Sequence, residues 1–132
     1  MKIPFLDLGA AYRELKPEID TALSRVLESG WYILGPEVEA FETEWAAYCD
    51  AKHAVGLANG LDALTLALRA LDIGPGDEVI VPSNTYIATW LAVTGVGATP
   101  VPVEPDVATH NIDPARIEAA ITSRTRALLP VH

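Results

Sequence analysis

The sequence has a single cysteine, Cys49, among its 132 residues. One thiol cannot form a disulfide within the chain, so we expect the reducing setting of the cytoplasm. Cys49 itself is expected to be a small packed hydrophobe and not a nucleophile. Cysteine and histidine also never cluster at the spacing of metal ligands, and the sequence therefore predicts no metal site.

Positive charge and long apolar runs are scarce as well. Lysine and arginine total 9 residues against 18 aspartate and glutamate residues, which gives a formal net charge of −9. This balance argues against nucleic acid or an acidic membrane surface as a partner, because both repel an acidic protein. No apolar run reaches the roughly 18 residues of a membrane span, and residues 1–7 lack the apolar core of a signal peptide. The sequence therefore predicts no nucleic-acid partner and no membrane partner.

The stretch around Asn59-Gly60 carries the most informative local pattern. A short apolar run, 54–57, precedes it, and leucines recur at helical spacing after it. This order is typical of a strand, a tight turn and a helix that begins at the turn, capped by Asn59 or Asp62. The first N–H groups of a helix lack partners and carry partial positive charge, so an anion, most often phosphate, fits there. Gly60 leaves room for the anion, although most turns of this kind bind nothing.

The chain divides by pattern into an N-terminal arm with a helical segment, 1–53, and an α/β part, 54–132. Proline near the start predicts an extended arm over 3–8. Apolar stripes predict helices over 16–29 and 37–50.

A loop of large apolar residues separates the two predicted helices. It contains Trp31 and Tyr32 and is bounded by Gly30 and Gly35. The loop must bury its aromatic side chains, either on the chain's own core or at a subunit interface or active site, and both alternatives stay open.

Strands alternate with helices in the second part of the chain. The expected strands are 54–57, 78–81, 98–103 (broken by Pro100 and Pro102) and 126–131, with helices that begin near residues 60, 87 and 113. Alternation of this kind predicts an α/β fold of βαβ units with a mainly parallel sheet. Because ligands lie at the carboxyl ends of such strands, the Asn59-Gly60 turn and the 83–86 turn are expected to line one pocket.

Taken together, six segments resemble the DegT/DnrJ/EryC1/StrS family of pyridoxal-phosphate-dependent nucleotide-sugar aminotransferases. They are residues 5–8, 29–36, 59–64, 74–82, 85–89 and 130–132. The resemblance implies the N-terminal part of the large domain of fold type I, the aspartate aminotransferase fold. It implies an enzyme that converts a keto-deoxysugar linked to dTDP or UDP into an amino sugar, with glutamate as amino donor. It also implies pyridoxal 5'-phosphate as cofactor and a homodimer.

The resemblance assigns the cofactor site residue by residue. It places the cofactor phosphate on Gly60, Leu61 and Asp62, mostly on their backbone N–H groups. Many relatives have serine or threonine where Leu61 stands, so here the backbone must act alone at that position. Tyr86 matches the aromatic residue that stacks on the pyridine ring, an arrangement that favours a flat cationic ring. Trp31 and Tyr32 are assigned to substrate binding.

The catalytic residues are expected outside this chain. The cofactor needs a lysine for its Schiff base and a carboxylate against the pyridine nitrogen. Lys2, Lys16 and Lys52 do not match the family's lysine, so both groups are expected beyond residue 132, where the chain stops within an apolar run. The open alternatives are a sugar dehydratase of the same fold, in which a histidine replaces the lysine, and a non-catalytic phosphate-binding fragment.

Overall fold

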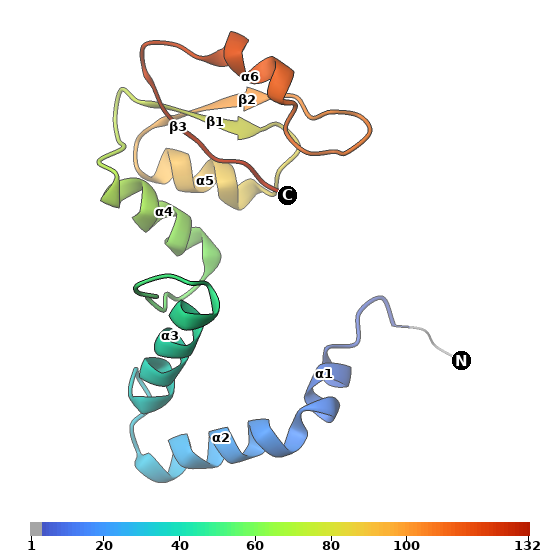
Figure 1. Ribbon diagram of the computed structural model, residues 1–132, viewed down its shortest axis with the longest axis vertical. Helices are drawn as coiled ribbons and strands as arrows, with labels where there is room; N and C mark the ends of the chain where they lie inside the picture. Colours follow the sequence, from blue (N-terminus) through green and yellow to red (C-terminus); the bar gives the residue numbers. More distant parts are fainter. Residues whose placement is uncertain (1–3) are drawn as a thin grey trace. The chain divides into compact units, whose positions relative to one another are not determined.

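The computed structural model describes residues 4–132, which form two compact units divided between Gly56 and Leu57 (Figure 1). The helical unit contains α1 (Leu8–Glu14), α2 (Lys16–Ser29) and α3 (Pro36–Tyr48). The sheet unit contains α4 (Gly60–Ala70), β1 (Glu78–Pro82), α5 (Ile87–Gly95), β2 (Thr99–Val103), α6 (Pro114–Ala120) and β3 (Thr125–Leu128). The domain boundary expected from the sequence, between residues 53 and 54, stays a prediction.

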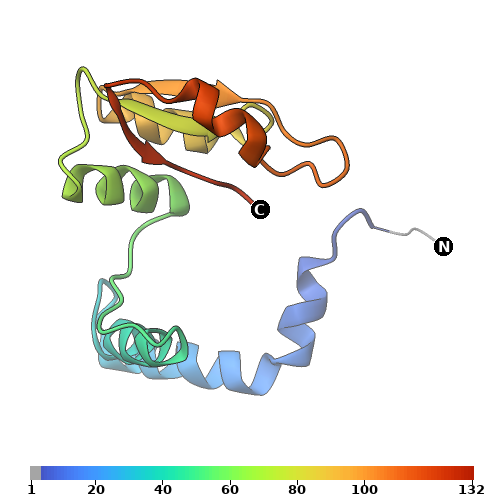
Figure 2. The ribbon, with the colours of Figure 1, turned by 45° about the horizontal axis from the view of Figure 1, so that its top comes forward.

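The sheet is parallel, with strand order β2-β1-β3, and the predicted α/β class is confirmed. Every residue of β1 is buried, as expected for a central strand with both faces covered. Successive crossovers run in opposite directions along the sheet, so right-handed connections place α5 and α6 on opposite faces (Figure 2). The core on the α5 side joins α4, β1 and α5 through Leu68, Val79, Val81 and Val93.

The strand β2 runs without a break through Pro100 and Pro102, which corrects the expectation that the prolines interrupt it. The Thr99 N–H donates to Asp77 O and Val103 O accepts from Ser83, so the odd-numbered residues of β2 bond to β1. The alternation of a strand then turns both prolines to the outer edge, where a missing N–H breaks no ladder bond.

The predicted strand at 54–57 is wrong. These residues belong to an irregular segment, and no described strand pairs with them. The Gly56 N–H donates instead to Glu42 Oε1 at 2.6 Å, and the Val55 side chain is 75% exposed. A strand exists only through bonds to a neighbour, which local sequence does not supply.

The helical unit follows its predicted pattern at α2, which has Pro17 in its first turn and ends at Gly30 in the left-handed conformation, with φ +66°. The helix α1 was not predicted. The predicted arm ended at Leu8, where α1 begins, and no element was predicted between that arm and the helix at 16–29. Ile3, the first residue of that arm, lies outside the described residues. Within the described part of the chain, no helix has the length and apolarity needed to cross a membrane.

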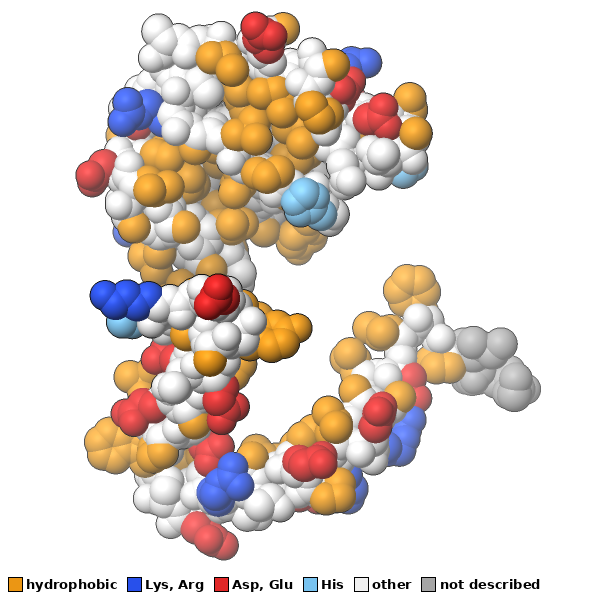
Figure 3. Space-filling model, viewed as in Figure 1, with side chains coloured by type: hydrophobic (Ala, Val, Ile, Leu, Met, Phe, Trp, Pro, Cys, Tyr) orange, Lys and Arg blue, Asp and Glu red, His pale blue; other side chains and the backbone are white. Residues whose placement is uncertain are grey.

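The helices of the helical unit bury almost none of their side chains. Among the residues of α1, α2 and α3, which the structure describes in full, Ala46 alone is buried. Apolar side chains lie along its surface (Figure 3), and Trp31 and Tyr32 are 65% and 66% exposed. The first alternative for the aromatic loop, packing on the chain's own core, is therefore wrong for the described residues.

A buried carboxylate fastens the start of β1 to the segment before β3. Glu78, whose side chain is 6% exposed, accepts hydrogen bonds from Thr122 Oγ1 and from Arg124 Nε at 2.5 and 2.9 Å. The bond from Thr122, and after it the bonds from Arg124, hold the pKa of Glu78 below its ordinary value of 4.5.

This pairing predicts an acid-sensitive stability. A depressed folded-state pKa means that the stabilisation is complete above the ordinary value of 4.5 and is lost as pH falls through the lower, folded-state pKa. Glu78→Gln removes this titration. We expect its unfolding free energy, measured by denaturant melts from about pH 6 to about pH 3, to fall less steeply than that of the parent protein. Parallel curves for the two proteins would contradict the role of Glu78.

Candidate functional site

The start of α4 is a capped helix end with a reciprocal side-chain pair. Asn59 Oδ1 accepts the Asp62 N–H at 2.9 Å, and Asn59 Nδ2 donates to Asp62 Oδ2 at 3.0 Å. The Ala63 N–H donates to Asn59 O at 3.1 Å as the first helical bond. Asn59 is therefore the cap, one of the two residues that the sequence offered for this role.

The cap leaves the amides of Gly60 and Leu61 without acceptors among the described residues. Both belong to the first turn of an 11-residue helix, where the peptide dipoles concentrate positive charge. A Cβ built on Gly60 meets no atom within 4 Å beyond the adjoining residues and the backbone of its own helix, so the space beside these amides is open. Two free donors, open space and a helix terminus fit a phosphate group.

The third predicted phosphate residue, Asp62, is differently placed. Its N–H is occupied by Asn59, so a contact of that amide with phosphate stays a prediction. The sequence did not reveal the pairing of the Asp62 carboxylate with the Asn59 amide, although the spacing of three residues on a helix start is its signal.

Tyr86 immediately precedes α5, and its side chain is 79% exposed. Figures 1 and 2 show α4 and α5 running in the same direction, so that both begin at the end of the sheet unit where β1 and β2 finish. The starts of α4 and α5, and with them Gly60 and Tyr86, thus lie at the same end of the unit, although only the turn before α5 follows a strand; that the two turns line one pocket stays a prediction. The hollow of about 450 Å³ that Asp62 lines beside α4 does not include Tyr86.

Trp31 and Tyr32 belong to the helical unit. Trp31 Nε1 donates to Ile33 O at 2.7 Å, which folds the indole back over its own loop. Gly35 has φ +103°, and a Cβ there would approach Trp31 Cδ1 to 3.0 Å. Both the backbone conformation and the close contact with Trp31 therefore favour glycine at this position. Their assignment to substrate binding stays a prediction.

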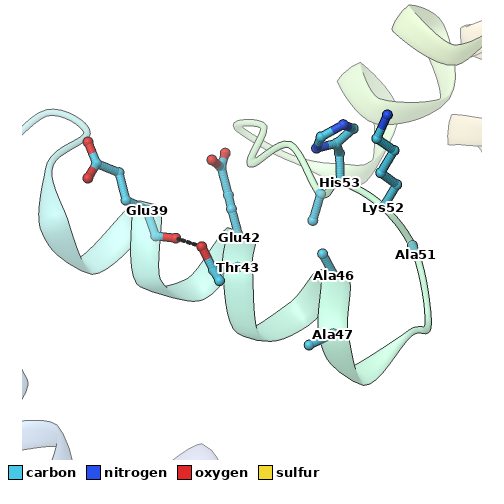
Figure 4. A pocket seen from close by; sticks show the side chains of 9 residues that line it. Glu39, Glu42, Thr43, Ala46, Ala47, Ala51, Lys52 and His53 are labelled. Atoms are coloured by element: carbon cyan, nitrogen blue, oxygen red, sulfur yellow. Dashed lines mark hydrogen bonds between the residues drawn. The ribbon is translucent and has the colours of Figure 1, made fainter.

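The lysines of the described chain offer no match for a Schiff-base amine. Hydrogen bonds to Asp20 first and to Tyr12 second raise the pKa of Lys16, whereas a nucleophilic lysine needs a lowered one. Lys52 lines a hollow of about 510 Å³ in the helical unit, together with Glu39, Glu42 and His53 (Figure 4). Residues 57–132 contain no lysine.

That hollow is not the predicted site. None of the residues assigned to cofactor or substrate lines it, and Glu42 is bonded to the Gly56 N–H. In the described part of the chain, no group of histidine, cysteine and acidic residues is arranged to hold a metal ion.

An α/β unit with an open helix terminus and an exposed aromatic residue at the same end has two of the groups that bind a phosphorylated ring compound. Residues 13–132 match the DegT/DnrJ/EryC1/StrS aminotransferase family, and the chain belongs to this family. The predicted family is thereby confirmed. Aminotransferases of this family depend in general on pyridoxal phosphate.

Relatives share high identity with the chain. A dTDP-3-amino-3,4,6-trideoxy-alpha-D-glucose transaminase of Streptomyces venezuelae is 66% identical over 99% of the chain and 35% of that protein. A dTDP-3-amino-3,6-dideoxy-alpha-D-galactopyranose transaminase of Aneurinibacillus thermoaerophilus is 64% identical over 98% of the chain and 36% of that protein. The chain therefore spans about a third of the length of these relatives.

Solved structures confirm the predicted fold. The crystal structure of S. venezuelae DesV in complex with a ketimine intermediate has a TM-score of 0.95 at 66% identity, over 99% of the chain and 35% of that structure. The structure of ntda from Bacillus subtilis with bound cofactor PMP has a TM-score of 0.92 at 38% identity, over 99% of the chain and 30% of that structure. The sheet unit is thus a part of the fold shared by these aminotransferases.

Proposed function

We propose that the chain is the N-terminal part of a pyridoxal-phosphate-dependent aminotransferase that converts a nucleotide-linked keto-deoxysugar into an amino sugar. The observation that carries this proposal is the pair of amides, Gly60 and Leu61, that have no acceptor among the described residues at the start of α4 in a chain of this family. The relatives named as dTDP-sugar transaminases support the substrate class. Glutamate is the proposed amino donor, and the cytoplasm, where a thiol stays reduced, is the proposed compartment. Cys49 is a free and exposed cysteine, which corrects the expectation that it is packed.

The residues of this chain act in the proposal by binding and orientation. The Gly60 and Leu61 amides donate to the cofactor phosphate, and Tyr86 lies against its ring. When bound, pyridoxal phosphate supplies the aldehyde that accepts the amino group and the electron-poor ring that makes the transfer possible. The lysine and the carboxylate of the catalytic site are proposed to come from segments outside this chain.

The full-length protein tests the proposal. It is expected to retain pyridoxal phosphate through desalting and, with glutamate, to aminate a dTDP- or UDP-linked keto sugar, with the product identified by mass spectrometry. Retention of no cofactor, or retention without amination of any keto sugar in such a panel, would contradict it.

We further propose that the aromatic loop contributes to a homodimer. Helices that are amphipathic but have no core of their own must cover their apolar faces elsewhere. The exposed apolar side chains of the loop are Trp31, Tyr32, Ile33 and Leu34, which are 65–81% exposed. Tryptophan and tyrosine are enriched at such interfaces, and a second copy of the chain is the occupant that we propose.

Trp31→Ala is expected to weaken the dimer of the full-length protein at least tenfold, because tryptophan is enriched among the few residues that carry most of the binding energy of an interface. Sedimentation velocity over a range of concentrations measures the change. The control is Val107→Ala, since Val107 is 90% exposed on a loop of the sheet unit and is assigned no role. Equal dimer affinities for Trp31→Ala and the parent protein would refute the loop's role.

A further inference from the structure

The side chain that caps α4 does more than a cap requires. A serine or aspartate at this position accepts one N–H and so satisfies the helix end. Asn59 accepts the Asp62 N–H with its oxygen and also donates from its Nδ2 to the Asp62 carboxylate. The second bond needs a donor as well as the acceptor; aspartate has no donor, serine and threonine carry both functions on one oxygen, and among the common caps only asparagine has them on separate atoms.

The position of Asp62 makes this second bond matter. Asp62 is the third residue of α4, and an acidic side chain at this position commonly reaches back toward the amides at the start of the helix. In that arrangement the acid takes the N–H of the cap residue, here Asn59, which adjoins the Gly60 and Leu61 amides that an incoming phosphate needs. A carboxylate that is free to move beside these two amides competes for their hydrogens and repels a phosphate dianion. In this structure the carboxylate is held by Asn59, and Asp62 lines the hollow beside α4 with Thr65 and Arg69.

We propose that Asn59 is a positioning residue for the cofactor phosphate: it holds the Asp62 carboxylate away from the Gly60 and Leu61 amides and leaves those amides open to the phosphate. The proposal rests on the proposed function, because it assumes that pyridoxal phosphate binds at α4. It assigns a role to Asn59, which the sequence alone offered only as a helix cap.

The test uses the charge of Asp62. In the full-length apo protein, we would measure the dissociation constants of pyridoxal phosphate and of pyridoxal, which lacks the phosphate. Asn59→Ala releases the carboxylate. We expect it to weaken pyridoxal phosphate about tenfold while pyridoxal changes less than about twofold. Asp62→Asn added to Asn59→Ala removes the released charge, and we expect the double variant to recover most of the lost affinity. The loss in the single variant should also shrink as salt is raised, because ions screen exposed charges.

A second variant separates capping from charge control. Asn59→Ser retains an oxygen for the Asp62 N–H and lacks the amide that holds the carboxylate. We expect it to weaken pyridoxal phosphate in the same direction as Asn59→Ala, with Asp62→Asn again restoring affinity, while its thermal midpoint stays near that of the parent protein. This variant keeps the proposal testable if Asn59→Ala fails to fold.

The outcomes distinguish the two proposals. A purely structural role for Asn59 would weaken pyridoxal and pyridoxal phosphate alike and would give no rescue by Asp62→Asn, and that result would overturn the inference. A parent protein that binds neither compound would overturn the proposed function instead. Parent protein that binds pyridoxal phosphate, together with variants that bind it equally well, would overturn the role of Asn59 alone.

Discussion

Gly60→Glu is expected to lower the affinity of the full-length protein for pyridoxal phosphate about a hundredfold while leaving the sheet unit folded. A Cβ at residue 60 meets no atom within 4 Å beyond the adjoining residues and the backbone of its own helix, so the backbone position accepts a side chain. An acidic residue in the first turn of a helix is favourable, and glycine there is replaced by a better helix former. The loss of affinity would therefore come from charge and bulk placed where the phosphate binds.

Gly95→Glu is the matched control for this experiment. Gly95 ends α5, and a Cβ built on it also meets nothing within 4 Å. The same charge is thus added to the opposite end of a neighbouring helix in the same unit. Cofactor titration by fluorescence or absorbance, with circular dichroism as a check on folding, should show normal affinity for Gly95→Glu. Normal affinity for Gly60→Glu as well would show that the phosphate binds elsewhere.

Val79→Asp is expected to destabilise the sheet unit by about 4 kcal/mol or more, a large part of the stability of an ordinary domain. Val79 lies at the centre of the sheet with 0% exposure and packs in the core with Leu68 and Val93. A carboxylate at this position would lie among the apolar side chains of that cluster. Denaturant unfolding of the full-length protein measures the change, or soluble yield where the variant does not fold.

Val107→Asp is the comparison for Val79→Asp, since it makes the same chemical change at a side chain that is 90% exposed. We expect its unfolding free energy to stay within about 0.5 kcal/mol of the parent protein. Similar losses for the two variants would mean that β1 is not the centre of the core.

The sequence predicted those elements whose signals are local. The apolar stripe, Pro17 and Gly30 define α2, and Asp113 caps α6 by accepting the Ala115 N–H at 2.9 Å. Alternation of strands and helices was enough for the parallel sheet. The strand prediction for 54–57 was wrong because an apolar pattern does not show whether a hydrogen-bonding neighbour exists, and none of the described strands pairs with this segment. The prediction that the prolines break β2 was wrong because a proline removes a ladder bond only where its nitrogen faces a neighbouring strand. Which way it faces is a property of the sheet and not of the strand's own sequence.

The candidate site was predictable in its backbone and less so in its side chains. The Asn59-Gly60 turn predicts a helix start, and the first N–H groups of every helix have no acceptor within the helix. Which amides stay free depends on the cap, and the structure gives the Asp62 N–H to Asn59, which leaves Gly60 and Leu61. The sequence could not reveal this, because Asn59 and Asp62 were equally good caps on residue type alone. The family resemblance added the cofactor, and the fold placed Tyr86 at the same end of the unit.

A crystal structure of the full-length protein grown with pyridoxal phosphate tests the central claim most directly. The account predicts phosphate oxygens about 3 Å from the Gly60 and Leu61 amide nitrogens, and the pyridine ring against the face of Tyr86. A cofactor phosphate bound away from the start of α4, with these two amides facing only solvent, would contradict it.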